Sequence, residues 1–232
     1  MKIPAQLLTL SAETASQYPS WYEAPETDRF FWEEKSLQRY PGKTPEDTYF
    51  AHAAKYAEFG KIICLSIGFI DRTQNEPRMR IKSLQGDERD ILAHFFRIVE
   101  ERFQANRLIL CAHNGKEFDF PYICRRATAL ELELPASLRL ENKKPWEVQH
   151  WDTLDFWKFG DRKHYISLEL LAHVLQISVP ESPIGAQDVN TAYHREQDEE
   201  KISQFSKRNV LLTTQIALKL KKQKAVEEVV FI

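Results

Sequence analysis

Residues 107–126, RLILCAHNGKEFDFPYICRR, contain the pattern that decides the fold. The apolar run 107–112 has the length and composition of a buried strand. A polar segment, His113–Lys116, follows it, and Asp119 then precedes an apolar stretch that we predict to be a helix from Phe120 onward. Open α/β sheets bind ligands where such strands end, so Asp119 is a candidate site residue. A helix cap is the simpler explanation for it.

Segments on both sides of this unit complete a predicted α/β fold in one sheet with helices against it. Strands are expected at residues 6–10, 61–70, 78–84, 107–112 and 148–152, and helices at 87–104, 120–132, 167–176, 186–196 and 198–222. The second and third strands should pair as a hairpin. The spacing predicts a single domain over residues 1–232, with an insertion of short helices and loops at about 16–60 and a tail at about 223–232.

The tail has an acidic pair followed by the apolar tip VVFI. Such a segment can add as an extended peptide to a partner or to an exposed sheet edge. We expect it to lie on the edge of its own sheet.

Composition excludes several classes of protein. The chain has 232 residues, 43% of them hydrophobic, and a net charge of −2, so it is globular and has no overall positive field that would attract nucleic acid or anionic lipid. Cys64, Cys111 and Cys124 are too few and too far apart for a disulfide framework or a zinc site, and the first two are expected to be buried thiols. The sequence has neither a signal peptide nor a membrane-spanning stretch, which predicts a cytoplasmic protein.

The stretch HNGKEFDFP, residues 113–121, resembles the second motif of the DEDD 3'-5' exonucleases. Further segments agree with it in order and spacing, and the resemblance covers about residues 7–220. They are YAEFGKIICLSIGF, IKSLQGDE, KKPWEVQHWDTLDFWKFGD and YISLELLAHVLQI. Together they are similar to a bacterial family of predicted 3'-5' exonucleases related to the proofreading domain of family B DNA polymerases. The resemblance implies a ribonuclease-H-like mixed sheet of about five strands flanked by helices.

It also implies hydrolysis of the 3'-terminal phosphodiester by two metal ions, Mg²⁺ or Mn²⁺, held about 3.5 to 4 Å apart by carboxylates. The family places an Asp-x-Glu on its first strand, where alternation points both side chains the same way. The second motif adds an Asp. The last helix adds a Tyr and, four residues later, an Asp on the same helical face.

Transferred to this chain, the resemblance assigns Glu13 and Asp119 as the remaining catalytic and metal-binding carboxylates. The first-strand Asp is replaced by Ser11, the helical Tyr by Phe205 and the helical Asp by Asn209. These replacements remove two negative charges from a site that must balance two dications. We expect the rate to fall by at least ~10³, or roughly 4 kcal/mol of transition-state stabilisation, and the chain to be a catalytically impaired exonuclease-like protein.

Two alternatives remain at this stage. In the first, the protein is an active metal-dependent exonuclease in which Asp152 supplies a third metal ligand, although Asp152 and Asp155 are more simply explained as a strand-end and helix-cap pair. In the second, it is a protein-interaction module that does not bind nucleic acid. The sequence does not distinguish natural loss of the motif residues from engineered substitution.

A substrate groove would hold the 3' end of single-stranded DNA or another nucleic acid. Cations interleaved with aromatic residues can contact phosphates and stack bases. The candidates are Asn114, Lys116, Phe118, Arg125, Lys158 and Lys163, with Arg126, Lys143, Lys144, Trp146, Trp157, Arg162, His164 and Tyr165 nearby in sequence. Solvated lysines and core tryptophans (Trp146, Trp151, Trp157) are the simpler explanation. We expect His113 to be a loop hydrogen bonder. The sequence does not identify a protein partner.

Overall fold

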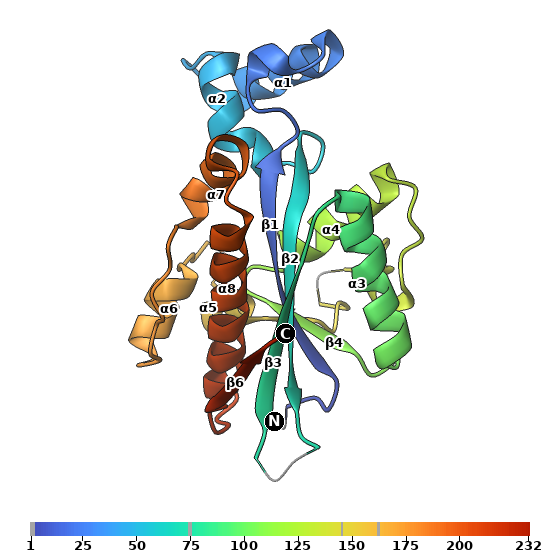
Figure 1. Cartoon of the computed structure of the whole chain (residues 1–232), viewed down its shortest axis with the longest axis vertical. Helices are drawn as coiled ribbons and strands as arrows, with labels where there is room; N and C mark the ends of the chain where they lie inside the picture. Colours follow the sequence, from blue (N-terminus) through green and yellow to red (C-terminus); the bar gives the residue numbers. More distant parts are fainter. Residues whose placement is uncertain (1–2, 74–75, 145, 162) are drawn as a thin grey trace.

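The computed structural model describes residues 3–73, 76–144, 146–161 and 163–232, and it has a mixed α/β architecture built on a six-stranded sheet (Figure 1). The strand order is β5-β4-β1-β2-β3-β6. The strands are β1 (Leu7–Ser16), β2 (Gly60–Asp71), β3 (Arg78–Gln85), β4 (Ile109–Ala112), β5 (Trp151–Asp152) and β6 (Glu228–Phe231).

Two long antiparallel pairings form the centre of the sheet. β2 pairs with β1 on one side and with β3 on the other, so the predicted hairpin is confirmed. The outer pairings, β1 with β4, β4 with β5 and β3 with β6, are parallel. The carboxyl ends of β1, β4 and β5 therefore point the same way, which brings the residues after β4 and β5 toward those of β1.

Helices cover both faces and one end of the sheet. They are α1 (Glu26–Arg39), α2 (Pro45–His52), α3 (Glu88–Arg102), α4 (Asp119–Ala129), α5 (Thr153–Lys158), α6 (Leu168–Val174), α7 (Val189–Thr191) and α8 (Glu199–Leu220). The long helix α8 packs on one face, and α3 and α4 pack on the other (Figure 1). The largest apolar cluster lies between the sheet and these last two helices, and includes Leu8, Leu65, Phe95, Phe120 and Ile123.

Several predicted boundaries differ from the structure because burial here is decided by distant parts of the chain. β1 continues from Leu7 to Ser16, beyond the predicted end at residue 10, because its second half pairs with β2 and is covered by α8. The predicted strand 148–152 is only Trp151–Asp152. The predicted helix 186–196 is broken into a 3₁₀ turn, α7 and a π turn.

The tail supplies the sixth strand, one more than the five expected. β6 lies parallel to β3, and Arg78 Nε is 2.7 Å from Glu228 Oε2 across this pairing. Gln215 of α8 holds the preceding turn by donating to the carbonyl of Val226 at 2.6 Å. The expectation that the tail lies on the edge of its own sheet is confirmed.

Between Ser16 and Gly60 the chain forms α1, α2 and two 3₁₀ turns, which lie beyond the ends of β1 and β2 at the top of Figure 1. This insertion has a small apolar centre of its own. Trp32 of α1 is fully buried there against Tyr49 and Phe59. Trp32 also donates to the carbonyl of Pro45 at 3.0 Å, which ties α1 to the start of α2.

The tryptophan and cysteine predictions have mixed outcomes. Trp151 is buried and Trp157 is partly buried, but Trp146 is 72% exposed, so its interpretation as a core residue is wrong. Cys64 and Cys111 are free, buried thiols as predicted. No helix within the described part of the chain is both long and apolar enough to cross a membrane.

Candidate functional site

Ser11 and Glu13, the two motif positions on the first strand, lie in the middle of β1 and not beyond its end. Ser11 and Glu13 are two residues apart and point to the same side of the strand. Ser11 Oγ donates a hydrogen bond of 2.8 Å to Glu13 Oε1. The pairing with β2 shifts register between Glu13 and Thr14, which locally bends the strand. Glu13 is only 8% exposed.

Helix α8 crosses over this part of β1. It carries Phe205 and Asn209, the third-motif positions at which the family has its helical Tyr and Asp. Asn209 Nδ2 donates to Glu13 Oε1 at 3.4 Å, and Ser206 Oγ donates to the carbonyl of Ser11 at 3.3 Å. The ring of Phe205 is buried in an apolar cluster that includes Ala15, Cys64 and Val189. Phe205 therefore serves the packing of α8 on the sheet, and Asn209 occupies the position next to Glu13.

Helix α4 brings Asp119 to the same strand. Asp119 is the first residue of the helix and is 6% exposed. Its Oδ1 accepts a hydrogen bond of 3.0 Å from the backbone N–H of Ala12. Phe118 occupies the N-cap position and makes no side-chain cap hydrogen bond. The helix-cap interpretation of Asp119 is therefore wrong, and its carboxyl group is directed at β1 between Ser11 and Glu13.

Burial dominates the electrostatics of the two acids. The loss of hydration raises the pKa of Asp119 from 3.8 to about 7; the hydrogen bond from Ala12 opposes this rise, and the neighbouring charges of Glu13 and Asp152 add to it. Burial also raises the pKa of Glu13, against hydrogen bonds from Ser11, Ser206 and Asn209. Near neutral pH this pair is therefore prone to hold a proton.

The donor set does not fit a two-metal centre. Within the residues that the structure describes, no group of three or more His, Cys, Asp or Glu side chains is arranged to hold a metal ion. Glu13 accepts hydrogen bonds from a hydroxyl and an amide, which are neutral groups at positions where the resemblance implies carboxylates. Two carboxylates supply at most two negative charges, which is too little for two dications.

Asp152, the alternative third ligand, is committed to the backbone. Its Oδ1 accepts from the N–H groups of Asn114 at 2.9 Å, Leu154 at 2.9 Å and Asp155 at 3.3 Å. Its Oδ2 accepts from the N–H of Lys116 at 3.0 Å. Asp152 is thus the N-cap of α5 and the support of the loop after β4, as the cap interpretation predicts.

Three of the predicted nucleic-acid contacts are engaged within the protein. Lys116 Nζ is 3.0 Å from Asp155 Oδ2, and Lys158 Nζ is 3.3 Å from Glu117 Oε1. These two ion pairs hold α5 against the second-motif loop. The ring of Phe118 packs beside Tyr122, with 5.2 Å between the ring centroids.

The other three predicted contacts differ in their surroundings. Asn114 has a left-handed backbone (φ 62°), which Asn tolerates better than most residues. Arg125 is exposed on the outer side of α4, and Lys163 is exposed between α5 and α6. Lys143 and Lys144 are exposed as well, whereas Arg162 lies outside the described residues. His113 bonds Thr153 and the carbonyl of Ile166, as predicted.

A pocket of about 1020 Å³ lies along the outer side of α4, away from the two acids. Lys116, Arg125 and Lys143 line it, together with apolar side chains that include Leu134 and Leu140. Neither Glu13 nor Asp119 lines this pocket, so it is separate from the acidic pair.

Sequence reasoning missed two residues that hold the third-motif position. Ser206 lies one helical turn before Asn209 and faces β1 with it. Arg208 Nη1 donates to Glu169 Oε1 at 3.0 Å and to Asn209 Oδ1 at 3.5 Å, so it orients the Asn209 amide. The three-residue spacing of Ser206 and Asn209 was a usable signal for a shared helical face. No sequence signal places Arg208 beside Glu169.

Comparison with known proteins agrees with this fold. A family model described as predicted 3'-5' exonuclease related to the exonuclease domain of PolB matches residues 55–228, which is more than half of the chain but begins after Ser11 and Glu13. A search of curated proteins gave no match.

Among solved structures, the family B DNA polymerase from the hyperthermophilic archaeon Pyrobaculum calidifontis superposes with a TM-score of 0.57 at 15% identity. The match covers 95% of this chain and 25% of the polymerase chain, so the protein spans a quarter of that polymerase's length. This similarity confirms the ribonuclease-H-like mixed sheet flanked by helices. The chain belongs to the family of predicted 3'-5' exonucleases related to the exonuclease domain of PolB.

Proposed function

We propose that this protein binds the 3' ends of single-stranded nucleic acid on an exonuclease fold and hydrolyses them poorly. The observation that carries the proposal is the hydrogen bonding of Glu13 Oε1 to Ser11 and Asn209. A carboxylate satisfied by a hydroxyl and an amide needs no cation. Family membership supports the exonuclease-like groove, and the altered motif residues support the loss of catalysis.

The charge balance sets the size of the expected loss. Two dications in a buried site need several carboxylates around them, because bringing unbalanced charge out of water is costly. Here Asp119 has a pKa of about 7, so near neutral pH it is about half protonated. A metal ion would have to displace that proton and the donors on Glu13. We therefore expect hydrolysis at least ~10³ slower than in a variant with the motif carboxylates restored.

Asp152 does not readily rescue the active-enzyme alternative. Four backbone N–H groups already donate to its two oxygens. Turning this carboxylate toward a metal would leave the loop after β4 and the start of α5 without hydrogen-bond acceptors, and each lost bond costs about 1 kcal/mol or more.

A time course on 5'-labelled single-stranded DNA with Mn²⁺ tests the catalytic part of the proposal. The chain is compared with the triple variant Ser11→Asp, Phe205→Tyr, Asn209→Asp. We expect only the triple variant to shorten the DNA from its 3' end. A fourth change in that background, Asp119→Asn, is the control and should abolish the shortening. Shortening by the unaltered chain that disappears in its own Asp119→Asn variant would overturn the proposal.

Fluorescence anisotropy tests the binding part. The labelled ligands are a single strand with a free 3' end and the same strand closed into a circle. We expect the linear strand to bind more tightly in the absence of metal, because the proposed site holds an end. Equal affinity for both strands would contradict recognition of the end, and no measurable affinity for either would contradict nucleic-acid binding altogether.

A further inference from the structure

Helix α1 of the insertion exposes more large apolar side chains than it buries. Among its residues only Trp32 and Ser36 are buried. By contrast, Phe30 is 56% exposed, Phe31 53% and Leu37 60%. An amphipathic helix on a protein surface normally shows the reverse distribution. An apolar patch of this kind marks an interaction site more often than a random surface feature.

These side chains share one side of the helix, with Glu33 and Glu34 between Phe30 and Leu37. Phe30 and Leu37 are seven residues apart and so lie two turns apart on the same face. Phe31 adjoins Phe30, and the two rings are 5.4 Å apart in an edge-to-face arrangement. We call Phe30, Phe31 and Leu37 the α1 stripe.

A shallow groove of about 520 Å³ runs beside the stripe, between α1 and the end of the insertion. Its apolar walls are Phe31 and Phe59. The charged groups that line it are Asp28, Glu34, Lys35 and Glu58, three carboxylates against one ammonium.

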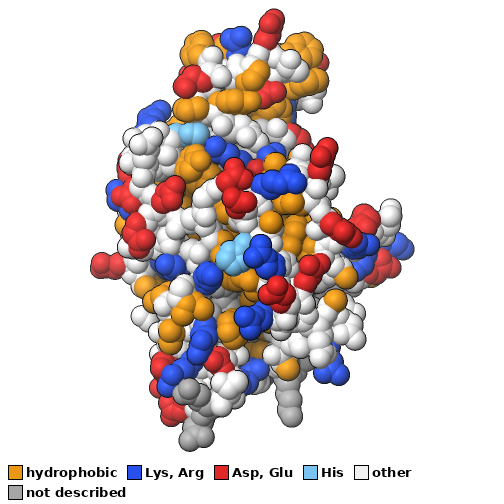
Figure 2. Space-filling model, turned by 45° about the vertical axis from the view of Figure 1, so that its right-hand side comes forward, with side chains coloured by type: hydrophobic (Ala, Val, Ile, Leu, Met, Phe, Trp, Pro, Cys, Tyr) orange, Lys and Arg blue, Asp and Glu red, His pale blue; other side chains and the backbone are white. Residues whose placement is uncertain are grey.

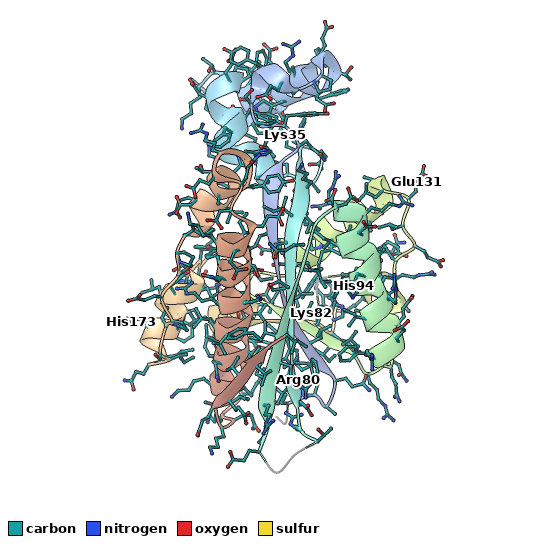
Figure 3. The ribbon with its side chains drawn as sticks, viewed as in Figure 1. Lys35, Arg80, Lys82, His94, Glu131 and His173 are labelled. Carbon is teal, nitrogen blue, oxygen red and sulfur yellow. The ribbon has the colours of Figure 1, made fainter. Side chains whose placement is uncertain are left out.

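Lys35 forms an ion pair with only one of these three carboxylates, Glu58. Figure 3 shows Lys35 on the side of the insertion that faces the sheet. Its Nζ lies over the ring of Tyr56, 4.2 Å from the centroid, and 3.5 Å from Glu58 Oε2. The groove therefore keeps an excess of negative charge beside its aromatic walls.

The outer face of α1 is acidic as well. Glu26, Glu33 and Glu34 are exposed, and they form no ion pair with any residue that the structure describes. Arg29 is turned away, over the ring of Trp21. Figure 2 shows hydrophobic and acidic side chains next to one another on the insertion at the top of the molecule.

The exposed carboxylates around the stripe favour some binding partners over others. Nucleic acid is disfavoured because its phosphates would meet Glu33 and Glu34. A second copy docking through the same stripe would bring two acidic patches together, since a twofold contact uses the same surface on both copies. A partner segment with Lys or Arg beside apolar anchors satisfies both the stripe and its acidic border.

We propose that the α1 stripe and the adjoining groove bind a cationic amphipathic segment of a partner protein. The partner's apolar side chains cover Phe30 and Leu37, and its Lys or Arg groups meet Glu33, Glu34 and the carboxylates of the groove. This inference is independent of the proposed function, because the stripe lies in the insertion and Glu13 and Asp119 do not line the groove.

The test uses the full chain and a synthetic helical peptide of about four turns made of Leu and Lys at amphipathic spacing, labelled for fluorescence anisotropy. Two comparison peptides replace every Lys by Glu or every Leu by Gln. We expect only the Leu/Lys peptide to bind. Binding of the Leu/Glu peptide with equal affinity, or no binding of the Leu/Lys peptide, would overturn the proposal.

Paired variants locate the binding. Phe30→Ser with Leu37→Ser, and separately Glu33→Lys with Glu34→Lys, should each weaken binding at least about tenfold. The controls are Leu170→Ser with Val174→Ser, an exposed apolar pair on α6, and Glu100→Lys with Glu101→Lys, an exposed acidic pair on α3. Affinity that falls equally in the controls would refute the assigned surface.

Two further measurements separate the remaining outcomes. All variants are exposed-surface changes and should keep the circular dichroism spectrum of the unaltered chain, and the Phe30→Ser, Leu37→Ser variant should also keep its single-strand affinity. Sedimentation analysis should find no dimer that depends on the stripe. A dimer lost in the Phe30→Ser, Leu37→Ser variant would assign the surface to a second copy and contradict the proposal.

Discussion

Glu13 and Asp119 are two buried carboxyl groups close to one another, so their negative charge must be offset by a cation, a proton or hydrogen-bond donors. In a metal-dependent nuclease that role belongs to cations. Here Ser11 and Asn209 donate to Glu13, and the N–H of Ala12 donates to Asp119. Burial raises the pKa of both acids, so protonation of one of them reduces the remaining repulsion between the two carboxylates.

Stability should therefore depend on the protonation of Asp119. Its pKa in the folded protein, about 7, lies above the unfolded value near 3.8, so the folded state binds the proton more tightly. The resulting stability is fully present below pH 4 and is lost as the pH rises through 7; Glu13 acts in the same direction. Urea unfolding should show a decline on the order of 2 kcal/mol between pH 5 and pH 8, which Asp119→Asn reduces. A decline unaffected by that substitution would exclude Asp119 as its source.

Metal binding should appear in thermal stability without any assay of activity. Mn²⁺ should leave the Tm of the unaltered chain unchanged, because the donor set does not fit. The Ser11→Asp, Asn209→Asp variant should be less stable without metal, since like charges repel, and should gain several degrees with Mn²⁺ at saturation. The control for both proteins is the same buffer with a chelator and no added Mn²⁺. An equal Mn²⁺ response in both proteins would show a metal site that the hydrogen bonding does not suggest.

At the scale of elements, one buried ion pair joins the hairpin, two helices and the insertion. Arg126 of α4 donates to both oxygens of Glu88 at the start of α3, at 2.9 and 2.7 Å. Glu88 also accepts from the N–H of Ile62 on β2, and Arg126 donates to the carbonyl of Ala57. The pair therefore sets how α3 and α4 sit relative to β2 near the insertion.

Breaking this pair on one side should cost more than removing it. Glu88→Gln leaves the buried guanidinium without its charge partner and should lower the free energy of unfolding by about 3 to 5 kcal/mol. The double variant Glu88→Met, Arg126→Met should lose less than the sum of the two single changes. Urea denaturation of the three variants measures this coupling, and strict additivity would show that the two residues act independently.

For the whole molecule, the net charge of −2 is unevenly distributed. The insertion presents unpaired carboxylates, whereas Arg125 and Lys163 are exposed on other parts of the surface. Lys116 and Lys158 are neutralised by Asp155 and Glu117. Of the cations on the second-motif loop and the helix after it, Lys116 and Arg126 are paired and Arg125 is not paired with any residue that the structure describes, so few are free there to attract a polyanion.

The salt dependence of single-strand binding should be shallow for this reason. Each phosphate neutralised contributes about −0.7 to the slope of log affinity against log salt, so two to four contacts give roughly −1.4 to −2.8. Arg125→Gln and Lys163→Gln should each reduce the slope by about 0.7. Arg97→Gln, on the exposed side of α3, is the control. A slope steeper than about −5 would show that the strand contacts many more cations than these two to four.

The sequence by itself determined the elements whose side-chain periodicity is local and strong. β2 is a continuous apolar run and β3 alternates beside it, while α3 and α8 each carry an apolar face. The second motif led to the family, and family membership led to the fold. The replacements at Ser11, Phe205 and Asn209 are likewise visible without coordinates.

Only the tertiary structure decided features that depend on burial by distant segments. β1 runs through Ser11 and Glu13 because α8 covers it, although its polar residues read as a strand end. Asp152 is not available to the acidic pair because its oxygens accept hydrogen bonds from the loop after β4. Trp146 is exposed, although tryptophan is usually buried. The exposed stripe on α1 has the same origin, since periodicity shows that a helix has an apolar face but not which face the rest of the molecule covers.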